Sequence, residues 1–331
     1  MKLEGKNVMV TGAAGFIGSH LCDLLSTSGI KKLVVLDNLY LGQKENLVLT
    51  RERCLDFKKS LVEYLDIQYN TANINLMREV LEIEQIDVVF DLATIPLPAS
   101  LEDPYWCFRE ITAMAASLAE LCRLGVFKTF IHCSTSEVYG SAEFAPMTEQ
   151  HPWNSRTSYA AAKGAADLCI KSYVSTFGID AVIIRPFNTF GPRQNAGNYA
   201  GVIPIFTNNM LTDKPCAVFG DGEQTRDFSY VTDVAAGFIA IAESDYIPGE
   251  VINLATNNEI SVNALGKMIF ATQNLEFEPV RLESRPGDVR RHCASTERLH
   301  SLTGFESCMP LDKGIAQTID WYKKISTYEC D

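Results

Sequence analysis

Tyr159 and Lys163 are the residues of this chain whose types and spacing most directly suggest proton chemistry. They stand four apart in a helix-compatible stretch, 159–176, and so share one face of the predicted helix. An ammonium beside a phenol favours the phenolate, which can take a proton from a substrate hydroxyl. Thr135, in the hydroxyl-rich run STSE at 134–137, is expected to hydrogen-bond the same substrate oxygen. An ordinary exposed helix pair is the alternative interpretation of Tyr159 and Lys163.

Three spaced glycines suggest a second kind of chemistry, the binding of a diphosphate. Gly12, Gly15 and Gly18 lie between a short β-branched run and a helix-compatible stretch. Without side chains there, the backbone can turn tightly and approach a pyrophosphate at the helix N-terminus. Asp37 ends the next apolar run, where its carboxylate can accept hydrogen bonds from a ribose 2′-hydroxyl and would repel a 2′-phosphate. The pattern predicts a dinucleotide site that prefers NAD to NADP.

The elements that must position these groups alternate between strand and helix. Such alternation predicts an α/β fold with a Rossmann-like, doubly wound parallel sheet. After residue 190 the chain becomes rich in Gly, Pro and Asn, which predicts a smaller, interleaved C-terminal lobe for the substrate. The expected strands are 7–11, 32–37, 87–94, 127–135 and 180–188. The expected NAD-binding domain is 1–187 with about 230–257 returning to it, and the expected substrate lobe is 188–229 with 258–331.

Composition excludes several classes of protein. The chain has 331 residues, of which 47% are hydrophobic, and a formal net charge of −12. A disordered chain is excluded, and an acidic protein is a poor partner for nucleic acid or an anionic membrane surface. The 10 cysteines form no CxxC pair or zinc-type cluster, and no run of 18 apolar residues occurs. We therefore expect a reduced, cytoplasmic enzyme with no metal site, no membrane segment and no nucleic-acid partner.

Seven motifs in order resemble the extended short-chain dehydrogenase/reductases that modify nucleotide sugars. That group includes 4-epimerases, 4,6-dehydratases and uronate decarboxylases. The resemblance implies tightly held NAD, a nucleotide-diphosphate sugar as substrate, most commonly a UDP-sugar, and a homodimer formed through helices at 105–123 and 159–176. The motifs are VTGAAGFIGSH (10–20), LDNLYLGQKENL (36–47), STSEVYG (134–140), YAAAK (159–163), RPFNTFGPRQ (185–194), GDGEQTRDFSYVTDV (220–234) and RPGDV (285–289).

The same resemblance implies roles for individual residues. Tyr159 would be the base, Lys163 would hold the nicotinamide ribose, and Thr135 would assist at the sugar hydroxyl. Further cofactor contacts are expected at Phe16, Ile17, Asn38, Asp66, Ile67, Leu92, Ala93 and Pro186, although Asp66 and Ile67 fit a solvated turn equally well. The nucleotide sugar is expected at Asn188, Arg193, Val202, Ala217, Phe219, Arg226, Arg285 and Asp288, where the arginines are suited to phosphate or ribose.

Glu137 is the residue whose identity bears on which product the enzyme forms. All members of the group first oxidise sugar C4, and dehydratases and decarboxylases then need a further group near C5. They carry glutamate at the place of Glu137, where many 4-epimerases have a small or neutral side chain. A dehydratase usually has an aspartic acid at the place of Ser136, and a decarboxylase has an arginine where Gly201 stands. Ser136 and Glu137 are thus further catalytic candidates, and the segment 94–104, with three prolines, is expected to line the sugar pocket.

Three hypotheses stay open at this point. The favoured one is a dehydratase or decarboxylase-like enzyme in which Glu137 acts near C5. A UDP-sugar 4-epimerase, which has no need of Glu137, is the alternative within the group. A non-catalytic NAD-binding scaffold is the alternative outside it, and the presence of Thr135, Tyr159 and Lys163 together argues against that hypothesis.

Overall fold

A seven-stranded parallel sheet forms the centre of the computed structural model, which describes residues 2–195, 200–284 and 289–328. The strand order is β10-β6-β5-β4-β1-β2-β3. The order reverses direction between β1 and β4, so a crevice opens there at the carboxyl ends of the strands. The strands are β1 (Asn7–Thr11), β2 (Lys32–Asp37), β3 (Ser60–Leu65), β4 (Val88–Asp91), β5 (Thr129–Cys133), β6 (Asp180–Pro186) and β10 (Val251–Leu254).

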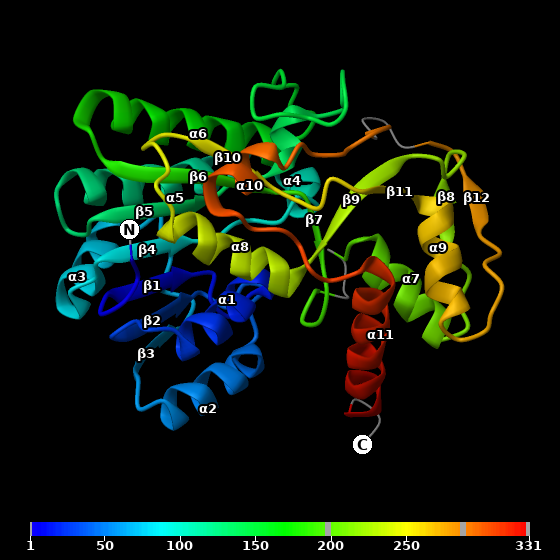
Figure 1. The fold of residues 1–331 in the computed structure, drawn as a ribbon, viewed down its shortest axis with the longest axis horizontal. Helices are drawn as coiled ribbons and strands as arrows, with labels where there is room; N and C mark the ends of the chain where they lie inside the picture. The colour runs from blue at the N-terminus through cyan, green and yellow to red at the C-terminus, as the bar shows by residue number, and fades with distance from the viewer. Residues whose placement is uncertain (1, 196–199, 285–288, 329–331) are drawn as a thin grey trace.

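Helices cover both faces of this sheet, as expected for buried parallel strands (Figure 1). Because side chains alternate along a strand, β1 sends Val8 and Val10 into one core and Met9 into the other. The first core is covered by α1 (Phe16–Thr27), α2 (Val48–Asp56), α8 (Val231–Glu243) and α10 (Glu297–Thr303). The second is covered by α3 (Ile74–Glu84), α5 (Pro104–Arg123) and α6 (Ser158–Phe177), and η1 (Lys44–Leu47), α4 (Ala99–Glu102) and η2 (Ser136–Tyr139) are short connecting turns.

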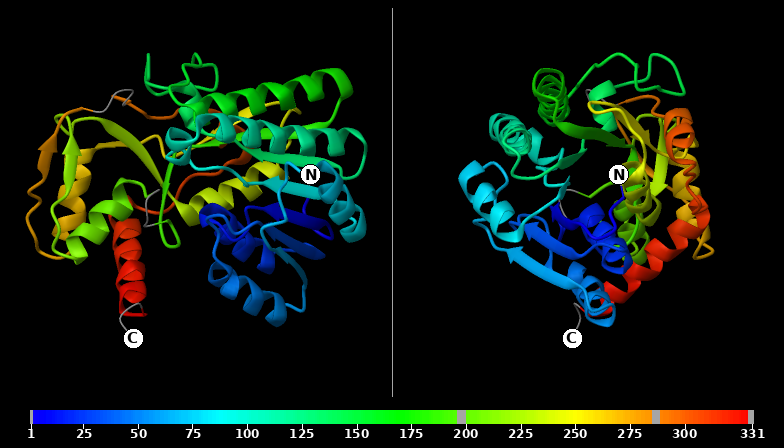
Figure 2. Two further views of the ribbon diagram at one scale, coloured as in Figure 1. Left: turned by 180° about the vertical axis from the view of Figure 1, so that it is seen from behind. Right: turned by 60° about the vertical axis from the view of Figure 1, so that its left-hand side comes forward.

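A smaller group of elements lies beyond β7, at the right in Figure 1 and at the left in the reversed view of Figure 2. It has its own apolar core, which includes Phe190, Phe206, Leu265 and Ile315. A three-stranded sheet, β11-β9-β7, and a two-stranded sheet, β12-β8, lie within it. Its elements are β7 (Asn188–Phe190), α7 (Val202–Leu211), β8 (Ala217–Phe219), β9 (Thr225–Tyr230), β11 (Glu259–Ser261), α9 (Val262–Ala271), β12 (Val280–Leu282) and α11 (Leu311–Tyr328).

The predicted Rossmann-like fold is confirmed, and all five expected strands are present. The sequence prediction missed β3 and β10. Strand β3 is a half-buried edge strand with mixed side chains, and β10 has only four residues, so neither carries a long apolar run. Because β10 pairs with β6 after the chain has formed β7 to β9, we propose the interleaved division 1–187 with about 230–257, and 188–229 with 258–331.

Within the described ranges, no helix combines the length and the apolarity that a membrane crossing requires.

Candidate functional site

The glycine turn after β1 brings backbone unusually close to the loop after β4. Gly12 has φ +64°, and a Cβ on it would lie 2.8 Å from the carbonyl oxygen of Leu92 and from the nitrogen of Ala93. A Cβ on Gly18 would collide with the carbonyl oxygen of Gly12. Helix α1 begins with Gly15 as its N-cap residue and has no side-chain cap. Its first backbone N–H groups therefore face the crevice, as diphosphate binding requires.

Asp37 lies beside this turn at the end of β2. Its Oδ2 accepts a hydrogen bond from the N–H of Ala14 at 2.9 Å, and its Oδ1 accepts one from the N–H of Leu39 at 2.8 Å. Burial raises the pKa of the Asp37 carboxyl, and these backbone hydrogen bonds oppose the shift. A Cβ on Gly42 would lie 2.7 Å from either carboxylate oxygen, so a larger residue there would displace the carboxylate. The carboxylate is thus fixed against the turn where a ribose would lie.

One cavity of about 1470 Å³ extends from this turn to the smaller group of elements. It exceeds the roughly 300–1,000 Å³ of an ordinary ligand pocket, which suits two ligands bound end to end. The predicted site residues that line it are Gly12, Gly15, Phe16, Ile17, Gly18, Asp37, Asn38, Ile67, Leu92, Ala93, Thr135, Glu137, Tyr159, Lys163, Pro186, Asn188, Arg193, Val202, Ala217, Phe219 and Arg226.

Two predicted residues, Ser136 and Asp66, do not line the cavity, and two others cannot be placed. Ser136 is buried behind the cavity wall, and its carbonyl oxygen is 3.3 Å from Nε2 of His292. Asp66 is exposed, and its Oδ1 accepts a hydrogen bond from the N–H of Gln68, as in a solvated turn. Arg285 and Asp288 lie outside the described residues.

Helix α6 holds the proposed base at the middle of the cavity. The helix is capped by the Thr157 hydroxyl, which accepts a hydrogen bond from the N–H of Ala160 at 3.1 Å. Tyr159 follows in the first turn, and burial strongly raises the pKa of its phenol. A hydrogen bond with Thr135 opposes that shift. One turn further, Lys163 Nζ donates a hydrogen bond to the carbonyl oxygen of Cys133, 2.8 Å away.

Glu137 follows Thr135 in η2 and faces the same cavity. The Thr135 Oγ1 accepts a hydrogen bond from the N–H of Glu137 at 3.2 Å, so the backbone of the two residues is locally fixed. Burial is the main cause of the raised pKa of Tyr159, and the negative charge of Glu137 adds to it. One cavity therefore holds two groups capable of proton transfer.

The opposite wall comes from the smaller group of elements. Asn188 begins β7, and Arg226 lies on β9, where its Nη1 donates to the carbonyl oxygens of Thr225 at 2.9 Å and Val289 at 2.6 Å. These bonds fix the guanidinium at the cavity wall. Arg193 forms an ion pair with Asp23 of α1 at 2.8 Å, which joins this wall to the glycine-turn helix.

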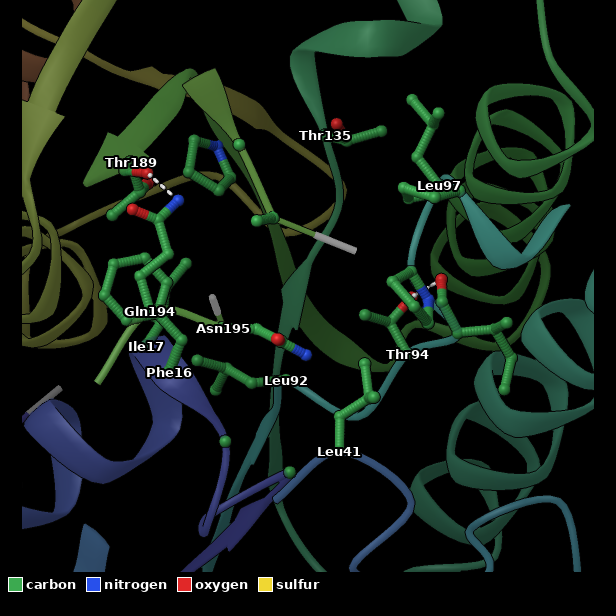
Figure 3. Close-up of a pocket in the computed structure, with 18 of the residues that line it drawn as sticks. Phe16, Ile17, Leu41, Leu92, Thr94, Leu97, Thr135, Thr189, Gln194 and Asn195 are labelled. Atoms are coloured by element: carbon green, nitrogen blue, oxygen red, sulfur yellow. Dashed lines mark hydrogen bonds between the residues drawn. The ribbon is translucent and has the colours of Figure 1, made fainter. Parts of the chain in front are cut away.

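Several lining residues were not predicted individually. Figure 3 shows Leu97 and Thr135 toward one end of the cavity, with Leu41 and Asn195 also lining it. Leu97 belongs to the proline-containing segment 94–104, which was expected to line the pocket. No sequence pattern indicated a binding role for Leu41 or Asn195 individually. Gln194, also in Figure 3, donates from Nε2 to the carbonyl oxygen of Thr189 at 3.2 Å and so stiffens the loop after β7.

A family model described as "NAD dependent epimerase/dehydratase family" matches residues 8–255, which span both the glycine turn and the proposed base. The chain belongs to this NAD-dependent epimerase/dehydratase family. Within the described residues, no cluster of side chains suited to a metal ion is found. The family's cofactor is NAD, and the glycine turn, the uncapped start of α1 and the fixed Asp37 carboxylate fit it.

Relatives within the epimerase/dehydratase family differ in activity. The chain is 32% identical to a UDP-glucose 4-epimerase of Mycolicibacterium smegmatis, over 96% of this chain and 99% of the relative. It is 30% identical to a dTDP-D-glucose 4,6-dehydratase of Bos taurus, over 96% of this chain and 89% of the relative. A Bacillus cereus UDP-glucuronic acid 4-epimerase, solved in complex with UDP-glucuronic acid and NAD, superposes with a TM-score of 0.84 at 30% identity, covering 96% of this chain and 99% of that one.

Proposed function

We propose that this protein oxidises a nucleotide-diphosphate sugar at C4 and then uses Glu137 as a base near C5. The observation that carries the proposal is that Thr135, Glu137, Tyr159 and Lys163 line one cavity, which continues to the glycine turn at one end and to Arg226 at the other. Bound NAD would accept a hydride from the sugar and later return it. The remaining steps belong to the protein's own residues.

Tyr159 and Thr135 act at the sugar hydroxyl. The partly buried phenol lies on the cavity wall and forms a hydrogen bond with Thr135, so both can contact one oxygen. Burial opposes ionisation of Tyr159. We expect the positive charge of Lys163, one helical turn away, to favour it. Tyr159 takes the hydroxyl proton as the C4 ketone forms. In a decarboxylase or an epimerase it returns that proton when the ketone is reduced, whereas the product of a dehydratase keeps the C4 ketone.

Glu137 determines what happens to the ketone. A ketone at C4 acidifies the proton on C5, and a carboxylate that lines the same cavity as Tyr159 can remove that proton. In a dehydratase the C6 hydroxyl then leaves as water. Ser136 does not line the cavity, so it is not placed to protonate that hydroxyl. The acid would be the protonated Glu137 itself, which has just received the C5 proton.

A UDP-sugar 4-epimerase is the second candidate. It is favoured by the similarity to a UDP-glucose 4-epimerase over nearly the whole of both chains. In that case the keto sugar would turn over within the cavity, and Glu137 would contribute only to binding. UDP is the nucleotide in the epimerase relatives, so we propose a UDP-sugar as the first substrate to test.

The test uses purified protein, a panel of nucleotide sugars and product mass. An unchanged mass indicates an epimerase, loss of water a dehydratase and loss of carbon dioxide a decarboxylase. For the favoured proposal, Glu137→Gln keeps cofactor reduction, read at 340 nm, but stops release of a lighter product. Glu120→Gln removes a partly exposed carboxylate that pairs with Arg123 on α5, away from the cavity, and serves as the control for an equal charge change. Unaltered turnover in Glu137→Gln would refute the role of Glu137.

We also propose a homodimer through α5 and α6. These helices pack side by side, and their outer surface exposes Tyr105, Phe108, Leu168 and Phe177. An exposed apolar patch of this kind is typical of an association surface. Light scattering of the wild type and of Leu168→Glu tests the proposal. A charge at position 168 lowers the measured molar mass only if this surface forms the dimer interface.

A further inference from the structure

Three ionisable side chains are buried behind the cavity wall, where the proposed mechanism does not use them. Asp91 ends β4, His132 lies on β5, and Asp167 lies on α6, one turn after Lys163. Asp91 and His132 are each 1% exposed and Asp167 is 0% exposed. Buried charges require partners, so the contacts of this cluster bear on which of its groups are charged.

Both carboxylates accept hydrogen bonds from other side chains. Asp91 Oδ1 accepts from the hydroxyl of Thr11 at 2.8 Å. Asp167 Oδ2 accepts from the Ser134 hydroxyl at 2.9 Å and from Arg185 Nε and Nη2 at 3.1 and 2.7 Å. Hydrogen bonds to a carboxylate, above all those from a guanidinium, favour its charged form.

The imidazole of His132 lies between these carboxylates. Its Nδ1 is 2.9 Å from Asp91 Oδ2, and its Nε2 is 3.9 Å from Asp167 Oδ1. A carboxylic acid is intrinsically a stronger acid than an imidazolium, so the proton in the first contact belongs to Nδ1. A lone pair on Nε2 would face a carboxylate oxygen, which is unfavourable without water. A proton on Nε2 makes the second contact attractive as well.

We infer that His132 is held as an imidazolium between Asp91 and Asp167, and that its charge leaves the charge of Lys163 free to act on Tyr159. Asp91, His132 and Asp167 then carry a net −1, which Arg185 neutralises. With a neutral imidazole, the same four groups would carry −1 in total and would offset Lys163 instead. This inference rests on the roles proposed for Tyr159 and Lys163.

The cluster is close enough to Lys163 for its charge to matter. Lys163 Nζ donates to the carbonyl oxygen of Cys133, the residue that follows His132. Burial raises the pKa of the Cys133 thiol; the charge of Lys163 lowers this pKa, and the charges of Asp91 and Asp167 raise it. The thiol in turn contributes to the raised pKa of Tyr159. His132 is therefore a positioning residue that acts through charge. The charged and titratable groups around His132 are Asp91 on β4, Lys163 and Asp167 on α6, Arg185 on β6 and Cys133 on β5.

The first test reads the protonation of His132 directly and does not depend on activity. Histidine-selective ¹⁵N labelling gives few signals, since the chain has five histidines, and His132→Gln assigns the one of interest. We expect both ring nitrogens of His132 to show the imidazolium signature at pH 7.5. His292 is equally buried and serves as a neutral reference, because burial lowers its pKa to about 4. A neutral-tautomer signature for His132 would overturn the inference.

The second test reads the effect on Tyr159. The rate of bound-NAD reduction by substrate is measured against pH in wild type, His132→Gln and His292→Gln. Loss of the imidazolium charge is expected to raise the apparent pKa of the acid limb by about 1 unit, with the rate recovered at higher pH. A loss of rate that is equal at every pH would indicate a merely structural role and would overturn the inference. If no nucleotide sugar reduces NAD, the proposed function fails, while the ¹⁵N result still decides the state of His132.

Discussion

His292 makes the folded protein sensitive to acid. Its ring is 1% exposed, packs on the ring of Phe187 with centroids 4.8 Å apart, and directs Nε2 toward the carbonyl oxygen of Ser136. Burial, aided by the charge of Arg226, lowers its pKa from 6.5 to about 4. The unfolded chain therefore binds a proton at this residue between pH 6.5 and 4 that the folded protein does not bind.

The magnitude follows from the difference in pKa. Stability is fully present above pH 6.5 and is lost as the pH falls toward 4, because protonation then favours the unfolded state. A difference of 2.5 units corresponds to about 3.4 kcal/mol when the loss is complete. At pH 5 about 2 kcal/mol of it is lost. His20, with its pKa also lowered to about 4, adds a similar loss in every variant that keeps it.

The assay is urea unfolding of wild type and His292→Gln at pH 7.5 and pH 5. We expect His292→Gln to be less stable at pH 7.5, because the aromatic packing is altered, but to lose about 2 kcal/mol less than wild type on acidification. Contributions from His20 and the carboxylates cancel in this comparison. His300→Gln changes a largely exposed histidine and is the matched control. Equal pH dependence in wild type and His292→Gln would refute the reasoning.

Three further predictions concern the cofactor turn and the buried polar groups. Gly18→Ala places a methyl group against the carbonyl of the motif's first glycine, so NAD binding measured by fluorescence titration should weaken at least about tenfold while the far-UV spectrum is retained. Arg185→Met leaves the Asp167 carboxylate buried without its guanidinium and should cost about 3–5 kcal/mol in urea unfolding; a cost below about 1 kcal/mol would contradict this. Tyr139→Phe removes a buried 2.8 Å hydrogen bond to Asn253 Oδ1 and should cost about 1–3 kcal/mol, whereas a neutral effect would show that the amide finds another donor.

Local sequence determined the cofactor half of the molecule well. The glycine turn, Asp37 and the YxxxK helix each lie within one strand–turn–helix unit, where spacing along the chain fixes spacing in the fold. Their positions could therefore be predicted before the structure was known. Strand β10 could not, because four residues become a strand only when β6 provides an edge for pairing.

Tertiary structure alone decided which distant residues meet. Asp91, His132 and Asp167 lie up to 76 positions apart, and their contacts exist only because β4 and β5 are neighbours in the sheet and α6 packs against them. Arg193 illustrates the same limit. Its residue type suggested a contact with a phosphate or ribose of the substrate, whereas in the fold its guanidinium pairs with the carboxylate of Asp23. Chain spacing encodes local geometry, whereas burial and the charge partners of a side chain depend on how the elements pack.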